Sequence, residues 1–233
     1  MGRLYQCGPD IFLIEGGVVS FYGAPYPTRC VIVKLDDGAL WVWSPVALDQ
    51  DLYREVAARG PVRHLVSPNK LHHLYLADWK RAFPKARVWG PRSTINKRPD
   101  VIFEPALGEM PPSPWVGEID QAWFRGSLFM DEIVFFHRAS RTAIIADLSE
   151  NFSPHFIATH WPWWLGWIAK PWKIVEGYGY APLEWRLSFT NRKLLRAARD
   201  KVLAWAPERV IMAHGTWQPS GGVAYLRRAF AWM

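Results

Sequence analysis

The chain has 233 residues, a length that favours one large domain over two small ones. Half of the residues are hydrophobic and 21% are charged, so enough apolar surface is present for a packed core and global disorder is excluded. The net charge of +7 favours anionic partners, and two cysteines are too few for a disulfide framework.

The expected elements fall into two similar halves, roughly residues 1–110 and 111–233, joined at the Pro-rich stretch from Gly108 to Pro114. Gly16-Gly17 and Asp36-Asp37-Gly38 each predict a hairpin. The expected strands are Ile11–Glu15, Val18–Tyr22, Cys30–Leu35, Ala39–Ser44, His64–Val66, Arg87–Trp89, Trp115–Ile119, Ala122–Phe124, Glu132–His137, Thr142–Ala146 and Arg209–Met212. The expected helices are Leu48–Arg59, Leu71–Phe83, Leu187–Trp205 and Gly222–Trp232. This order predicts an α/β sandwich of two sheets with outer helices, in a single domain over residues 1–233.

Polar groups follow three of the buried strands, where functional sites of α/β folds usually lie. His72 and His73 come after the strand at 64–66, Asp147 after that at 142–146, and His214 after that at 209–212. Each residue alone has an ordinary explanation, such as a helix cap for Asp147. Together, three histidines and a carboxylate have the composition of a catalytic zinc or iron centre.

The order of these motifs resembles the metallo-β-lactamase superfamily. There, a first motif His-x-His-x-Asp-His follows a strand, a later strand ends in a metal-bridging Asp, and a late strand ends in a His before Gly. In this alignment Pro68 and Lys70 replace the first two histidines, and His72 takes the place of the Asp. His73, Asp147 and His214 match the later positions, while the middle histidine of the family is missing.

A closer resemblance is to a branch of that superfamily classed as a domain of unknown function. It covers nearly the whole chain and includes the stretches Pro27-Thr28-Arg29, Ser44-Pro45, Pro68-Asn69, Asp78-Trp79, Phe136-His137-Arg138 and Ala213-His214-Gly215. It implies a metallo-β-lactamase-like αββα sandwich of two mixed sheets with outer helices. It implies no substrate.

The departures from the superfamily motif imply one divalent ion in place of two. We expect His72, His73, Asp147 and His214 to hold it, with zinc as the first candidate and iron or manganese as alternatives. Lys70 would replace the missing cation or hold an anionic substrate group, and Asp147 would act as a general base if it is not a ligand.

Asn69, Glu132 and Asn151, and two tryptophans, Trp163 and Trp164, are the residues we expect to support the ligands or to contact substrate. The expected function is metal-dependent hydrolysis of a small molecule, anionic or apolar. The alternative is a catalytically inactive protein that binds a small ligand in the same Trp-lined cleft without metal.

The most unusual feature of the composition is its 15 tryptophans, many of them between His160 and Trp185. This Trp-rich insertion, about residues 155–186, follows the Asp147 strand. Three interpretations remain open: helices that cover the core, an apolar wall of the pocket or a dimer surface, and an interfacial membrane element. Nucleic acid is not favoured, because no basic residues alternate with aromatics in a known binding motif.

The expected location is cytoplasmic. Asp10 and Glu15 interrupt the N-terminal apolar residues, and the most apolar stretch, Trp161 to Ala169, is too short for a membrane span.

Overall fold

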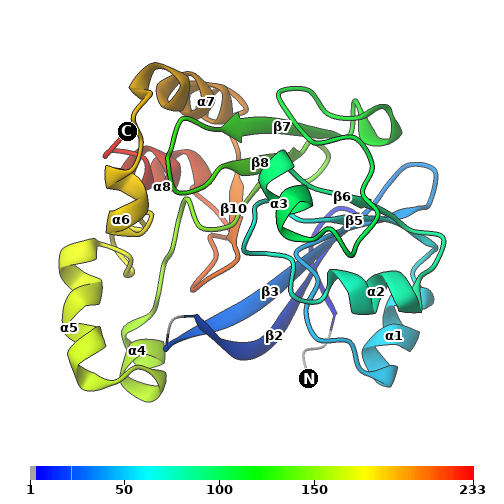
Figure 1. Ribbon diagram of the computed structural model, residues 1–233, viewed down its shortest axis with the longest axis horizontal. Coiled ribbons are helices and arrows are strands. Elements are labelled where there is room, and N and C mark those ends of the chain that lie inside the picture. The colour runs from blue at the N-terminus through cyan, green and yellow to red at the C-terminus, as the bar shows by residue number, and fades with distance from the viewer. Residues whose placement is uncertain (1–3, 22) are drawn as a thin grey trace.

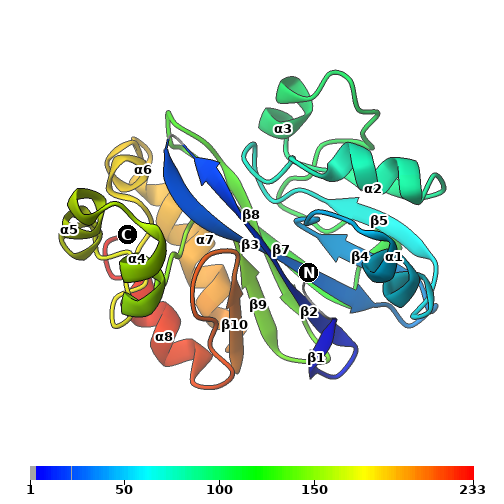
Figure 2. The ribbon, with the colours of Figure 1, turned by 90° about the horizontal axis from the view of Figure 1, so that it is seen from below.

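The computed structural model describes residues 4–21 and 23–233, which form two sheets packed face to face with helices on both outer sides (Figures 1 and 2). The larger sheet has the order β1 (Tyr5–Gly8), β2 (Ile11–Phe21), β3 (Ala24–Lys34), β4 (Leu40–Trp43), β5 (Val62–Val66) and β6 (Arg87–Trp89). The smaller sheet has the order β10 (Arg209–Met212), β9 (Thr142–Ile145), β8 (Glu132–His137) and β7 (Ile119–Phe124).

The helices divide between the two outer faces (Figure 2). The larger sheet is covered by α1 (Gln50–Ala57), α2 (Leu76–Ala82) and α3 (Arg92–Lys97). On the other side lie α4 (Pro154–His160), α5 (Trp163–Trp172), α6 (Leu183–Leu187), α7 (Arg192–Ala204) and α8 (Gly222–Ala229). Among the described helices, none combines the length and the apolar character that a bilayer crossing requires.

The alternation of side chains along each strand builds the core in layers. In β4, Trp41 and Trp43 point into the space between the sheets, whereas Leu40 and Val42 pack on the α1–α2 side. Trp41 meets Phe135 of the opposite sheet edge to face, with ring centroids 5.0 Å apart. A further buried layer lies between the smaller sheet and helices α6 to α8. The predicted α/β class with two sheets and outer helices is confirmed.

Several expected boundaries were wrong. The glycines at 16 and 17 do not form a turn: β2 runs through them with a register shift between Glu15 and Val18, and Phe21 pairs with Ala24. The last residue of the strand expected there, Tyr22, lies outside the described residues.

In the second half, a single 3-10 turn, η1 (Ser113–Trp115), replaces the strand expected to begin at Trp115. The helix expected over 187–205 begins only at Arg192, where the side chain of Asn191 caps α7 by accepting from the backbone N–H of Leu194, and Leu187 instead ends α6. α2 begins only at Leu76, so residues 70–75 form turns instead of the first part of a helix.

Parallel pairing within each sheet, and the face-to-face packing of the two sheets, bring the ends of the site-bearing strands together. β5 lies parallel to β4 and β6, and β10 lies parallel to β9. The loops that follow β5, β9 and β10 therefore meet at one edge of the sandwich, across the line where the two sheets face each other.

Candidate metal centre

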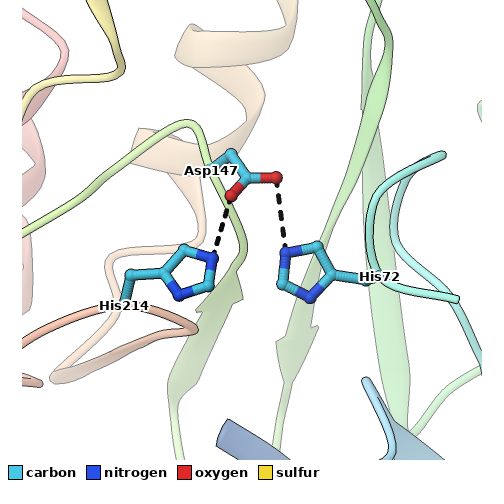
Figure 3. A group of neighbouring side chains, drawn as sticks. All are labelled: His72, Asp147 and His214. Carbon is cyan, nitrogen blue, oxygen red and sulfur yellow. Dashed lines mark ion pairs between the residues drawn. The ribbon is translucent and has the colours of Figure 1, made fainter. Parts of the chain in front are cut away.

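Three of the expected ligands converge at this edge. The Nε2 atom of His72 lies 3.3 Å from Oδ2 of Asp147, and Nε2 of His214 lies 3.1 Å from Oδ1 of the same carboxylate (Figure 3). The two rings approach from opposite sides, and one ligand atom from each residue lies within 4.8 Å of the others. Asp147 and His214 are buried and His72 is nearly so, so the donors are shielded from bulk water.

The outer nitrogen of each histidine is held by the protein. Nδ1 of His214 lies 2.8 Å from the carbonyl oxygen of Pro27, and Nδ1 of His72 lies 2.7 Å from the hydroxyl of Ser44. Hydrogen bonds of this kind are typical of metal-ligating histidines, because they fix the ring and direct the other nitrogen to the metal.

The hydrogen bond of His214 also determines where its lone pair lies. The Pro27 carbonyl can only accept, so Nδ1 of His214 carries the proton and Nε2 of the neutral ring carries the lone pair. That lone pair faces the Asp147 carboxylate, and two acceptors at 3.1 Å repel each other unless a cation or a proton lies between them. The donor set therefore fits a divalent metal ion, and without one it requires a protonated imidazole.

Asp147 is kept ionised by its neighbours. Burial alone would raise the pKa of this carboxyl, but the adjacent His72 and His214 outweigh burial and hold the pKa well below its usual range. The amide of Asn69 donates to Oδ2 of Asp147 at 2.8 Å and to Glu132 at 3.0 Å. Asn69 thus joins two buried carboxylates that would otherwise repel each other.

Glu132 fixes the backbone at the start of the loop that carries Asp147 through two hydrogen bonds. Its two oxygens accept from the backbone N–H groups of Ala146 and Asp147, each at 2.9 Å. Burial and then the charge of Asp147 raise the pKa of Glu132 to about 8. Asn151 braces the other side of the site, because its side chain donates to the carbonyl of Thr216, in the loop that carries His214, at 2.7 Å.

Three of the four expected ligands lie together, and the fourth does not. His73 lies on the neighbouring turn, where its Nδ1 faces the guanidinium of Arg98 at 3.2 Å, outside the three-residue group. Burial and the positive charges of Lys97 and Arg98 lower the pKa of His73 to about 4. Adjacent side chains in a turn diverge, and only His72 is directed at Asp147.

Two further expectations need correction. Lys70 does not reach the three ligands: its ammonium donates to the carbonyl of Phe129 and lies 4.9 Å from the centre of that ring. Trp163 and Trp164 do not line the pocket, because both lie on the outer face of α5, where 78% and 54% of their surfaces are exposed.

A cavity of about 180 Å³ opens beside the ligands. Its walls are mainly apolar and aromatic, and the tryptophan that lines it is Trp185. Asp147, His72 and His214 form part of the lining, together with the carboxyl groups of Glu150 and Glu184. The space suits a small ligand with an apolar part.

Ser44, Tyr26 and Glu150 are residues that the sequence did not assign to the site. Ser44 follows β4 with φ of 49°, a left-handed conformation that is rare outside glycine. Tyr26 packs edge to face on His214, and its hydroxyl lies 3.5 Å from Glu150. The available signal was that Ser44 also follows a buried strand, next to a proline, as the other site residues follow theirs.

Comparison with known proteins identifies the family and the fold. A family model described as a domain of unknown function (DUF4336) matches residues 17–159, and no curated protein matches the chain. Among solved structures, the DIM-1 metallo-β-lactamase is similar with a TM-score of 0.65 and 14% identity, over 99% of this chain and 95% of that one.

A metallo-β-lactamase from Pontibacter korlensis has a TM-score of 0.63 and 10% identity, over 100% of this chain and 98% of that one. A metal-soaked Flv1 flavodiiron core from Synechocystis has a TM-score of 0.62 and 9% identity, over 99% of this chain and 60% of that one. The fold is therefore that of the metallo-β-lactamases, as the sequence motifs predict.

Proposed function

The chain belongs to the DUF4336 family and has the metallo-β-lactamase fold, and from this premise we propose that it is a metal-dependent hydrolase of a small substrate. One divalent ion would be held by His72, Asp147 and His214. The observation that carries the proposal is the direction of the two histidines. Each is hydrogen-bonded through its Nδ1 atom, and the Nε2 atoms of both point at the carboxylate of Asp147.

The donor set favours zinc. Two imidazoles and one carboxylate are a known ligand set of catalytic zinc, and the same set also suits non-haem iron. An ion in this position would supply Lewis acidity, which activates water and polarises a carbonyl or phosphoryl oxygen. The similar structures include metallo-β-lactamases and a metal-soaked flavodiiron core, which supports a metal in this fold without fixing its identity.

The remaining side chains would bind and orient the substrate. The apolar wall around Met130 and Trp185 would take the apolar part of a small molecule and exclude water from the ligands. Glu150, which is fully buried beside the cavity, has its pKa raised by burial and then by the charge of Asp147. A protonated carboxyl in this position can donate a proton to a leaving group.

Metal content of the untagged protein tests the proposal, and the adjacent histidines provide a matched pair of variants. We expect about one equivalent of zinc, iron or manganese by emission spectroscopy, lost in His72→Ala and kept in His73→Ala. Less than about a tenth of an equivalent after incubation with each of these ions would refute the metal site. Equal loss in both variants would refute the ligand assignment.

A metal-free binding protein is the second candidate. It is favoured by one observation: the cavity beside His72 and Asp147 has a mainly apolar lining that can bind a small molecule by itself. In that case a protonated His214 would neutralise Asp147, and the protein would bind small apolar molecules equally well with and without a chelator.

A further inference from the structure

Helix α5 presents three indole rings to solvent. Trp163, Trp164 and Trp167 expose 78%, 54% and 78% of their surfaces. With about 100° of rotation per residue, Trp163, Trp167 and Lys170 form one stripe, and Trp164 lies beside it. Exposed large apolar groups gathered on one face are typical of an interaction surface. We refer to Trp163, Trp164, Trp167 and Lys170 as the Trp face.

The Trp face lies on a rigid support. The opposite side of α5 packs on a small core around Phe152 and Trp161, and the indole N–H of Trp161 donates to the carbonyl of Pro25 at 2.8 Å. At the end of α5, Arg186 donates to the carbonyl of Trp172 at 2.8 Å. The helix is therefore fixed to the rest of the protein, and the three rings are displayed without rearrangement.

The segment that carries the Trp face contains basic residues and no acidic ones, and the next acidic residues along the chain are the exposed Glu176 and Glu184. No Asp or Glu occurs from Asn151 to Val175, whereas Lys170 and Lys173 follow the tryptophans in the same segment. Lys170 is exposed, and Lys173 lies over the rings of Tyr178 and Tyr180, at 5.4 and 5.3 Å. The lysine within the face favours an anionic partner that also accepts apolar rings.

We propose that the Trp face binds the surface of an anionic lipid bilayer. The boundary between lipid headgroups and acyl chains is the environment that indole prefers, because the ring enters the apolar region while the N–H stays hydrated. Lysines at the edge of such a face contact anionic headgroups. A second copy of the chain fits less well, since two-fold pairing of this face would place the Lys170 side chains of the two copies in the same interface.

Flotation with vesicles tests the proposal. The probes are vesicles of phosphatidylcholine with about one third phosphatidylserine, and vesicles of phosphatidylcholine alone. We expect the protein to float with the anionic vesicles, and added salt to weaken this binding. The double variant Trp163→Ser/Trp167→Ser should bind at least about tenfold more weakly, and each single variant should lie between.

The control replaces two equally exposed apolar side chains elsewhere. Ile102 and Leu128 expose 89% and 84% of their surfaces, and the variant Ile102→Ser/Leu128→Ser should bind like the unchanged protein. Lys170→Glu should weaken binding to anionic vesicles about tenfold while leaving the circular dichroism spectrum unchanged.

Three results would overturn the proposal. They are failure of the unchanged protein to float with anionic vesicles, equal binding by the Trp163→Ser/Trp167→Ser variant, and equal loss in the control. Self-association that disappears in the Trp variants, without vesicle binding, would assign the face to a second copy and would also overturn it.

Discussion

Replacing Ser44 by alanine or by glycine separates two contributions of this residue, the hydrogen bond of its side chain and the strain of its backbone. The hydroxyl lies 2.7 Å from Nδ1 of His72, and Ser44 itself is buried. Its φ of 49° places an L-residue in the left-handed region. Alanine removes the hydrogen bond and keeps the strain, whereas glycine removes both.

The two changes should differ in stability by a measurable amount. A buried ring nitrogen left without its partner costs about 1.5 kcal/mol, so Ser44→Ala should lower the free energy of unfolding by about that much. Glycine adopts the left-handed conformation without steric cost, which recovers about 1 kcal/mol, so Ser44→Gly should lose only about 0.5 kcal/mol. Urea unfolding in the presence of a chelator measures both values without a contribution from metal.

Metal affinity should fall in both variants alike. A histidine that loses its outer hydrogen bond binds metal about 10–100-fold more weakly, and titration calorimetry with zinc measures this loss. Ser140→Ala is the matched control, because Ser140 lies 2.8 Å from Nδ1 of the buried His137, which is not part of the three-residue group. That variant should lose stability and keep its zinc affinity. Equal stabilities of the two Ser44 variants would refute the strain argument, and unchanged zinc affinity would refute the positioning of His72.

Asn69→Ala should lower the free energy of unfolding by about 3 kcal/mol in urea, because it leaves two buried carboxylates without their shared donor; a loss below about 1 kcal/mol would contradict this role. Gly215→Ala should cost about 4 kcal/mol or prevent folding, since an added Cβ would lie 2.1 Å from the carbonyl oxygen of Asn151. Gly221→Ala, also at positive φ but in open space, should cost only about 1 kcal/mol in the same assay. Burial lowers the pKa of His137 from 6.5 to about 4. Between these two pH values the unfolded chain protonates this histidine and the folded protein does not, so the free energy of unfolding decreases as the pH falls from 6.5 to about 4. His137→Phe should therefore reduce the decrease in unfolding free energy between pH 7 and pH 4, by up to about 3 kcal/mol, and an unchanged pH profile would refute this account.

Much of the site could be predicted because it follows a rule that sequence can express. Asp147, His214 and His72 each follow a buried strand; parallel pairing of β9 and β10 brings Asp147 and His214 together, and the packing of the two sheets brings His72 to them. The rule does not predict which way each side chain points within the loop that follows the strand. His72 and His73 are adjacent in the sequence, but only one of two neighbouring side chains in a turn can point at Asp147.

The parts that could not be predicted depend on backbone groups and on conformations without a sequence signature. The carbonyl of Pro27 holds His214, yet every residue has a carbonyl. The left-handed backbone at Ser44 appears only once the loop is built. The pocket tryptophans were expected to be Trp163 and Trp164, but Trp185, at the end of the same insertion, lines the cavity, whereas Trp163 and Trp164 are exposed on α5.

The three ligands come from opposite sides of the sandwich. His72 follows a strand of the larger sheet, and Asp147 and His214 follow strands of the smaller one. An ion bound to all three would cross-link the sheets, and neither half of the chain alone contains all three residues. Its binding energy would oppose separation of the sheets at this edge and slow amide hydrogen exchange in the loops after β5, β9 and β10. The complete set of three ligands would therefore exist only where the two sheets are packed together.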